Sequence, residues 1–420
     1  MNGENAKLYH EDNLYILGKW FAIERRQKEF STRGLSRSSN INTSLISDIE
    51  NQKTRPNLET LKELYKELDI SFITDETHLQ TVQENILSLY YAVYDQNINT
   101  VKDLLAGLKS QVKALKYSPI TVDILIIESV VATIIPEYEI PKAFFALKNH
   151  LTYLSVAQKE HYYISLGYEQ LKNNDYQDAL ESFHLAISFH REGRGSAVSH
   201  ELIATIHSKL FDPLKAIEYS SKASRLHAKY SNITRKISSD FIQIKSYLEL
   251  NQPHQAEVLI KNLSYVLVES NQRQWYELKS FETYLYYKKE QYEKSLELLN
   301  KIPQKHIHLE LLHLQLVIHL KRHEEQQKIF ERLLEEYDEN QYPLENALIH
   351  VIHYPRNQEL YPFMDKALNY LRHHFELIDE YDVAKDVVDK SIQYTLFKKD
   401  LENLEHWINI YRKLMKFEKF

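Results

Sequence analysis

Histidine, a common metal ligand, gathers in one stretch of this sequence, HIHLELLHLQLVIHLKRHEEQQ within residues 305–327. His319 and His323 are four residues apart, which would place them on one face of a helix. A zinc site of the H-E-x-x-H type needs a second histidine, which the EEQQ after His323 does not supply. No third ligand is evident, so we predict no metal site and expect these histidines to face solvent.

Other catalytic motifs are missing as well. Cysteine is absent, which removes thiolate catalysis, disulfides and cysteine-based metal sites together. The sequence contains no phosphate-binding loop, nucleophile elbow or dinucleotide fingerprint, and its 420 residues include 7 glycines. We predict that the protein is not an enzyme, has no catalytic residues and uses no cofactor.

A second polar pattern occurs in SSNINTSLISDIENQKTRPNLETLKELYKELDI. Its apolar residues at 41, 45, 46 and 49 fall on one helical face and leave the other face to four short polar side chains: Thr43, Ser44, Ser47 and Asp48. Short polar side chains on a protruding helix enter a groove without bulk. DNA is therefore one candidate partner for this helix.

The charge distribution agrees with a nucleic-acid partner for the N-terminal part. Between Lys19 and Arg55 there are eight lysines and arginines against four acidic residues, whereas the whole chain has a net charge of −7. A basic module on an acidic body is typical of DNA binding by the module alone. The alternative is an ordinary solvated surface of mixed charge.

Composition favours a helical protein without a membrane span. Apolar residues make up 43% of the chain, and none of the apolar runs is long enough to cross a bilayer. The N-terminus has neither a basic start nor an apolar core typical of a secretory signal, so we expect a cytoplasmic protein. Few glycines and 30 tyrosines favour helices over tight β-turns.

The first 70 or so residues read as a set of short helices. The pattern predicts them over 17–30, 32–39, 42–51 and 58–68. Asn40 suits a left-handed backbone position, while Asn42 and Asn57 are expected to cap the helices that follow them. We predict a DNA-binding domain over 1–70, a linker over 71–84 and a repeat domain over 85–420.

Beyond residue 84 the sequence repeats a two-helix pattern. The clearest pair is HYYISLGYEQLKNNDYQDALESFHLAI, in which Gly167 and Ala179 would let two antiparallel helices approach and Phe183 would fill the gap between pairs. The small residues at 179, 216, 256 and 295 are spaced by 37, 40 and 39 positions. Tetratricopeptide repeats have a period of about 34 residues, so these pairs resemble lengthened tetratricopeptide repeats.

Stacked pairs of this kind bury their faces against one another and form a right-handed solenoid with a concave inner surface. Such a surface binds an extended peptide or a partner helix. The alternative is that the repeats serve as a dimerisation scaffold alone.

The N-terminal motif resembles the Cro/Xre-type helix-turn-helix. The match runs through TRGLSRSSNINTSLISDIENQKTRPNLETL, and its most specific part is the tail from Ile49 and Glu50 to Pro56 and Leu61. The sequence departs from the pattern at Thr32, where a glutamine is usual, and at Gln52, where a glycine is usual. A module of this type followed by tetratricopeptide-like repeats resembles the RRNPP family of peptide-pheromone-responsive regulators.

This resemblance implies a homodimeric transcription regulator that binds double-stranded DNA, with a short signalling peptide in the repeat groove. The second helix of a helix-turn-helix lies in the major groove, which would turn Thr43, Ser44, Ser47 and Asp48 toward the bases. The residues expected near phosphates or at the helix start are Thr32, Arg33, Asn42, Lys53 and Arg55. Asp48 would either accept from a cytosine amine or pair with a neighbouring arginine.

The repeat register places a set of polar and aromatic side chains on the inner helices. The expected peptide contacts are Tyr168, Glu201, Thr205, Lys209, Phe241, Lys245, Tyr284 and Tyr287, with Gln243 and Asn173 as weaker candidates. This mixture suits a short peptide with charged ends and apolar side chains. Alternatively, tyrosines at helical spacing are simply the core of the repeats.

Two other functions remain open from the sequence. The repeats would also serve an adaptor that binds a response regulator or another protein, with DNA binding secondary or lost. The serine-rich second helix would also fit a module that keeps its fold but no longer binds DNA. Salt-dependent binding to the DNA upstream of its own gene distinguishes a regulator from both.

Overall fold

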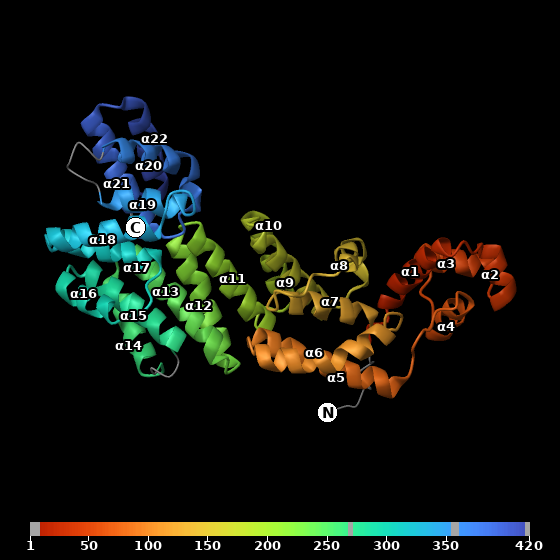
Figure 1. The fold of residues 1–420 in the computed structure, drawn as a ribbon. Coiled ribbons are helices and arrows are strands. Elements are labelled where there is room, and N and C mark those ends of the chain that lie inside the picture. Colours follow the sequence, from red (N-terminus) through yellow and green to blue (C-terminus); the bar gives the residue numbers. More distant parts are fainter. Residues whose placement is uncertain (1–8, 268–271, 354–360, 416–420) are drawn as a thin grey trace. The chain divides into compact units, whose positions relative to one another are not determined.

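The computed structural model describes residues 9–267, 272–353 and 361–415. Throughout these residues every regular element is a helix (Figure 1), which confirms the predicted all-α class. The chain divides into two compact units, one formed by residues within 1–202 and 225–235 and the other within 203–224 and 236–420. None of the described helices is both long and apolar enough to cross a membrane.

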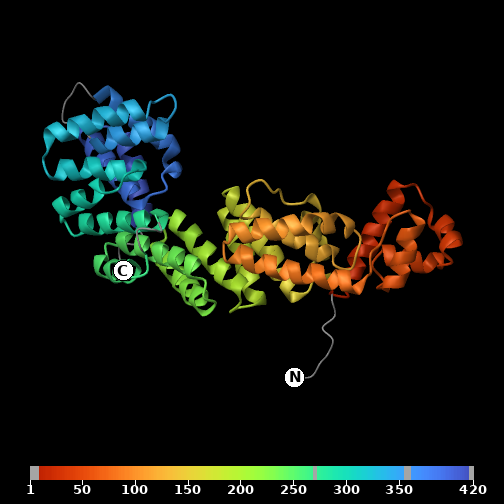
Figure 2. The same ribbon diagram turned by 60° about the horizontal axis from the view of Figure 1, so that its bottom comes forward.

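The first unit begins with four short helices and continues with longer ones. They are α1 (Asn13–Gln27), α2 (Thr32–Ser39), α3 (Thr43–Glu50), α4 (Leu58–Glu67), α5 (Glu76–Tyr94), α6 (Ile98–Ala114), α7 (Thr121–Ala132), α8 (Lys142–Ala146), the 3-10 helix η1 (Leu147–Tyr153), α9 (Val156–Lys172) and α10 (Tyr176–Phe189). Helices α5 and α6 pack side by side, as do α9 and α10 (Figures 1 and 2).

Three helices contribute residues to both units: α11 (Arg194–Lys209), α12 (Pro213–Lys229) and α13 (Ile233–Glu249). The second unit continues with α14 (Pro253–Ser264), α15 (Gln272–Lys288), α16 (Tyr292–Asn300), α17 (Ile307–His319), α18 (His323–Glu336), α19 (Pro343–His353), α20 (Tyr361–His374), the 3-10 helix η3 (Phe375–Leu377), α21 (Tyr381–Lys398) and α22 (Leu401–Leu414). Neighbouring helices in this series pack as pairs, as the repeated pattern predicts.

Close approach of paired helices depends on small residues, as α9 and α10 show. A Cβ added to Gly167 would lie 2.7 Å from the ring of Phe183, so the aromatic ring fills the space that glycine leaves. We expected Phe183 to fill the gap between pairs, and this was wrong. Phe183 is fully buried and packs against α9, within its own pair, because Gly167 leaves no side chain there.

At several helix ends asparagine, and not glycine, adopts the left-handed backbone conformation that ends the helix. Asn40, Asn174 and Asn251 have left-handed backbones with φ of 57°, 63° and 54°, a conformation that asparagine tolerates better than most residues. No described glycine has a positive φ. The left-handed backbone expected at Asn40 is confirmed.

Candidate functional site

The turn between α2 and α3 is fixed by local side-chain hydrogen bonds. Ser31 caps α2 by accepting from the Gly34 amide at 2.9 Å, and Asn40 ends this helix in a left-handed conformation. The Asn42 carboxamide oxygen then accepts from the Ser44 amide at 3.0 Å and starts α3. The predicted caps at Asn40, Asn42 and Asn57 are therefore confirmed, the last by a bond from the Thr60 amide.

One face of α3 is held by the core of the first four helices. Ile46 and Ile49 are fully buried in a cluster with Leu35 of α2 and Leu61 of α4. We expected Leu45 on this face, but it is exposed, because the buried face of α3 is formed by Ile46, Ile49 and Glu50 at positions i, i+3 and i+4. Leu45 therefore adds an apolar group to the exposed side of α3.

The polar face of α3 is accessible to a ligand. Ser44 and Ser47 are exposed, while Thr43 and Asp48 are half-buried. The Ser44 hydroxyl donates to Asn42 at 3.0 Å, and the Ser47 hydroxyl accepts from the Asn51 amide at 3.4 Å. The hydroxyl oxygens keep acceptor capacity, so these short side chains still offer hydrogen bonds to a groove.

The cations around this face differ in their partners. Arg33 and Lys53 are exposed and make no ion pair among the residues that the structure describes, whereas Arg55 pairs with Glu11 at 3.0 Å and Asp12 at 3.3 Å. Thr32 is half-buried at the start of α2. Arg33 and Lys53 are thus available to phosphates, while Arg55 would have to leave two carboxylates.

A buried ion pair that the sequence did not single out holds α3 against α1. Arg25 and Glu50 are 9% and 4% exposed, and the guanidinium donates to both carboxylate oxygens, at 2.8 Å to Oε2. The hydrogen bond to Glu50 raises the pKa of Arg25. Nearby, a Cβ on Gly18 would lie 2.8 Å from Ile49, so glycine permits the close packing of α1 on α3.

Within the first unit, side chains of α1 contact helices that come later in the sequence. Asn13 of α1 donates to Gln158 of α9 at 3.1 Å, and Gln158 donates back at 2.9 Å. Gln158 also donates to Asp123 of α7 at 2.8 Å, and burial raises the pKa of Asp123 to about 6. Tyr15 stacks on Tyr153 with ring centroids 4.7 Å apart. Helix α1 is therefore held by α9 and η1.

A cavity of about 530 Å³ in the second unit is the strongest candidate for ligand binding. It is lined from α13, α15, α17, the loop before α17 and the start of α21 by Lys245, Leu248, Glu249, Arg273, Tyr276, Glu277, Ser280, Phe281, Tyr284, Ile302, Gln304, His306, His308, Leu309, Glu380 and Asp382. Two of the predicted peptide contacts, Lys245 and Tyr284, therefore face one hollow.

Charges in this cavity are arranged around Lys245. Its ammonium group lies 3.1 Å from the Glu380 carboxylate, with which it pairs, and 3.9 Å from Glu249, which is too far for a hydrogen bond. Lys288 pairs with Asp382 at 2.5 Å. The hydrogen bond from His308 to Asp379, at 3.1 Å, is the main cause that lowers the pKa of Asp379 to about 2.

Glu249 is the poorly satisfied member of this group. Its side chain is 3% exposed, and neither carboxyl oxygen has a hydrogen-bond partner among the residues that the structure describes. Burial raises the pKa of Glu249 to about 8. Lys245 and Lys288 oppose this shift, whereas Glu380 and Asp382 add to it. At neutral pH the free protein therefore carries this side chain mostly in its protonated form.

The raised pKa predicts a pH-dependent gain in stability for Glu249→Gln. In the unfolded chain the carboxyl ionises near 4.5, whereas the folded protein keeps the proton to about pH 8. The contribution of Glu249 to stability is fully present below pH 4.5 and is lost as pH rises toward 8. Glutamine cannot ionise, so the variant avoids a loss of roughly 3–5 kcal/mol at pH 8.

Urea unfolding at pH 4.5 and at pH 8 measures this effect. Glu249→Gln and the wild type are expected to unfold at similar urea concentrations at pH 4.5, and the variant at a higher one at pH 8. The control is Glu257→Gln on α14, whose carboxylate is 43% exposed and pairs with Lys289 at 2.7 Å. It should give no gain at pH 8, and an equal gain in both variants would contradict the assignment.

The remaining predicted peptide contacts occupy different surroundings. Phe241 is buried against Phe281, and Tyr287 contacts His319 at 3.3 Å. Thr205 is half-buried and Lys209 is exposed on α11. Of the weaker candidates, Gln243 is buried and accepts from Ser221, and Asn173 is exposed at the end of α9. His319, one of the two histidines first considered for metal binding, stacks on Tyr292.

Glu201 and Tyr168 belong to the first unit. Glu201 is 7% exposed, with Arg235 at 3.1 Å from one oxygen and His227 at 2.8 Å from the other. Burial opposes its ionisation, but these two neighbours outweigh burial and lower the pKa of Glu201. Tyr168 is half-buried with its ring edge-on to Phe183. The carboxylate of Glu201 therefore interacts with side chains in the interior of the first unit.

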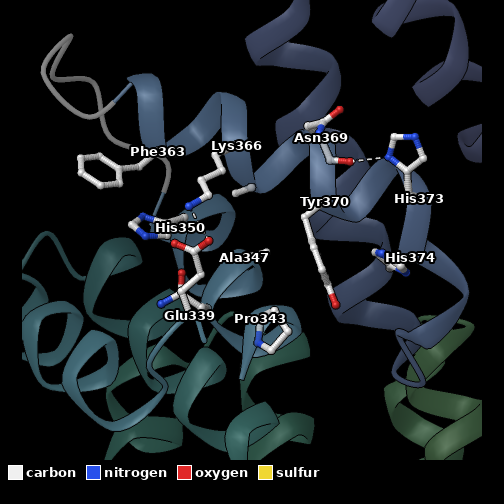
Figure 3. A pocket seen from close by; sticks show the side chains of 12 residues that line it. Glu339, Pro343, Ala347, His350, Phe363, Lys366, Asn369, Tyr370, His373 and His374 are labelled. Atoms are coloured by element: carbon white, nitrogen blue, oxygen red, sulfur yellow. Dashed lines mark hydrogen bonds and ion pairs between the residues drawn. The ribbon is translucent and has the colours of Figure 1, made fainter. Parts of the chain in front are cut away.

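A smaller cavity of about 260 Å³ lies between α19 and α20 (Figure 3). Its charged groups already have partners: Lys366 pairs with Glu339 at 2.5 Å, and His373 contacts the Asn369 carbonyl at 2.8 Å. Burial lowers the pKa of His350, whose ring stacks on Phe363. Because Lys366 and Glu339 already pair with each other, this cavity makes a weaker case for a ligand than the one around Glu249.

The paired helices place the chain in the class of helical-repeat folds, and comparison with solved structures agrees. The apo form of the quorum sensor NprR from B. thuringiensis is similar with a TM-score of 0.62 and 14% identity, covering 80% of this chain and 98% of that one. A Rap protein complexed with competence and sporulation factor has a TM-score of 0.59 and 12% identity, covering 81% and 98%.

The apo form of RapI is similar to the same degree, with a TM-score of 0.61, 12% identity and coverage of 81% of this chain and 100% of that one. Sequence identities this low show that the fold is shared. They do not show which ligand this chain binds, which has to be argued from its own residues. No protein-family model and no curated protein matches the sequence. The predicted tetratricopeptide-like architecture is confirmed by these structures.

Proposed function

We propose that the protein is a transcription regulator of the RRNPP type, which binds operator DNA through α3 and is controlled by a short signalling peptide. The observation that carries the DNA-binding half is the accessible polar face of α3, together with the exposed Arg33 and Lys53, which have no ion pair in the described part of the chain. The fold likeness to NprR and to a Rap protein solved with a signalling factor supports the peptide-binding half.

In this proposal the side chains of α3 have two tasks. Thr43, Ser44, Ser47 and Asp48 face base edges, and Thr32, Arg33 and Lys53 lie near phosphates. The reading face carries no arginine, so sequence preference comes from several modest contacts over two half-sites. Two half-sites require two copies of the module, and we therefore propose a homodimer acting in the cytoplasm.

Substitutions in and beside α3 separate these two tasks. Lys53→Ala is expected to weaken binding to specific and random duplexes alike and to reduce the salt dependence by about one phosphate contact. Ser44→Ala should change the preference among sequences and leave binding to random DNA nearly unchanged. Fluorescence anisotropy with the DNA upstream of the gene and with a random duplex, over a range of salt concentrations, measures both.

Lys328→Ala is the control for the loss of one positive charge. Lys328 is an exposed lysine on α18 and has no ion pair in the described structure. The variant should bind both duplexes as the wild type does. Equal losses on both duplexes from Ser44→Ala would contradict the division of roles, because a base-reading residue must discriminate.

An adaptor that binds a protein partner through its repeats is the second candidate, because two Rap structures are among the similar folds. The same anisotropy experiment separates it from a regulator. If neither duplex binds the wild-type protein in a salt-dependent manner, the DNA-binding half of the proposal fails and the adaptor is favoured.

A further inference from the structure

The cavity around Lys245 has more negative than positive groups in its wall. Besides the buried Glu249, three acidic side chains line it, those of Glu277, Glu380 and Asp382, against two permanent cations, Lys245 and Arg273. Lys245 is engaged mainly by Glu380, which it meets at 3.1 Å. A positively charged guest is therefore favoured over a negatively charged one.

A second observation indicates where the positive group of such a guest would bind. Within the described part of the chain both oxygens of Glu249 lack a hydrogen-bond partner although the side chain is 3% exposed, and Lys245 lies 3.9 Å away. Buried carboxylates are normally satisfied by donors, so an unpartnered one in a cavity wall marks a missing group. An ammonium or guanidinium supplies both charge and N–H donors at such a position.

Aromatic side chains of the same cavity suit the rest of such a guest. Tyr276, Phe281 and Tyr284 line it together with Leu248, and Tyr284 is fixed by donating to the His308 carbonyl at 3.2 Å. Aromatic faces attract cations and pack against the methylene groups of a long side chain. The lining therefore fits an aliphatic stem that ends in a positive charge.

We propose that Glu249 receives a cationic group of the bound peptide, either a lysine or arginine side chain or the free amino terminus. This proposal rests on the peptide-binding function proposed above and specifies the chemistry of its ligand. A cation close to Glu249 stabilises the carboxylate form, so peptide binding releases the proton that the free protein carries at neutral pH. Lys245 and Lys288 oppose the guest, whereas Glu380 and Asp382 attract it.

Short random peptides with a fluorophore at the carboxyl end test the charge requirement on the full-length protein. In each pool one position is fixed as lysine, norleucine or glutamate, because norleucine keeps the chain length of lysine without its charge. A parallel set is acetylated at the amino terminus. We expect one lysine pool, or the pools with free amino termini, to bind about thirtyfold more tightly than the uncharged match.

Two variants assign the effect to the carboxylate. Glu249→Gln is expected to remove most of this preference, and Glu257→Gln, half-exposed on α14, should keep it. Calorimetry of the preferred pool in two buffers of different ionisation enthalpy should show release of nearly one proton per peptide at pH 7 for the wild type and none for Glu249→Gln. A purely structural role of Glu249 would not produce this proton release.

The possible failures are distinct. If norleucine pools bind as tightly as lysine pools, or Glu249→Gln keeps the preference for charge, the role of Glu249 is overturned while peptide binding stands. If no pool binds the wild-type protein, the proposed peptide-binding function fails together with the role of Glu249. Circular dichroism of each variant verifies that a loss is not caused by unfolding.

Discussion

Arg235→Ala is expected to destabilise the first unit by about 3–5 kcal/mol, since it breaks a buried ion pair and leaves the other charge in the interior. Arg235 is 1% exposed and donates to the Tyr94 carbonyl at 2.6 Å and to Glu201 at 3.1 Å. These bonds join the start of α13 to the end of α5 and to α11. In the variant, His227 still lies 2.8 Å from Glu201.

Urea unfolding followed by circular dichroism measures the shift for Arg235→Ala. Arg225→Ala on α12 is the matched control, because this arginine is exposed and belongs to the same unit. Exposed substitutions usually change stability by less than about 0.5 kcal/mol. A shift for Arg235→Ala no larger than that of the control would show that the buried ion pair does not stabilise the unit.

Glu50→Gln is expected to abolish specific DNA binding while peptide binding remains. The substitution leaves the buried guanidinium of Arg25 without a carboxylate, at a cost of about 3–5 kcal/mol, and removes the bond that ties α3 to α1. A displaced or frayed α3 cannot present Ser44 and Ser47 together. The peptide cavity belongs to the second unit and is built from other helices.

Anisotropy with labelled DNA and with the labelled peptide pools tests both parts of this expectation. Glu59→Gln, an exposed carboxylate in the first turn of α4, is the control and should bind DNA normally. Replacing both Arg25 and Glu50 by leucine removes the charges as a pair and should restore part of the DNA binding. Normal DNA binding by Glu50→Gln alone would refute the anchoring role of this ion pair.

Local signals made the N-terminal helices predictable. The boundaries of α2 follow from Ser31 and Asn40, and Asn42 and Asn57 cap the next helices because their short side chains reach a free amide within three residues. The beginning of α1 was less predictable. It starts at Asn13, four residues before the expected position, and Asn13 is held there by Gln158, which is 145 positions away.

The cavity around Lys245 was also hard to predict, because it depends on residues that are far apart in the sequence. Lys245 and Tyr284 were predicted because helical spacing places them on inner helices. Glu249 follows Lys245 by one helical turn, so its position could have been noted from spacing, but its missing partners could not. The contact between Lys245 and Asp379 joins residues 134 positions apart, and nothing in the local sequence indicates that the start of α21 closes this cavity.

The exchange of hydrogen bonds between Asn13 and Gln158 also bears on protein engineering. A chimaera that grafts a foreign N-terminal module onto this chain after α4 would remove Asn13 and leave Gln158 without that partner. It would also strip Tyr153 of the ring of Tyr15. A functional graft must therefore carry the matching asparagine and tyrosine on its first helix, or replace the facing residues of η1 and α9.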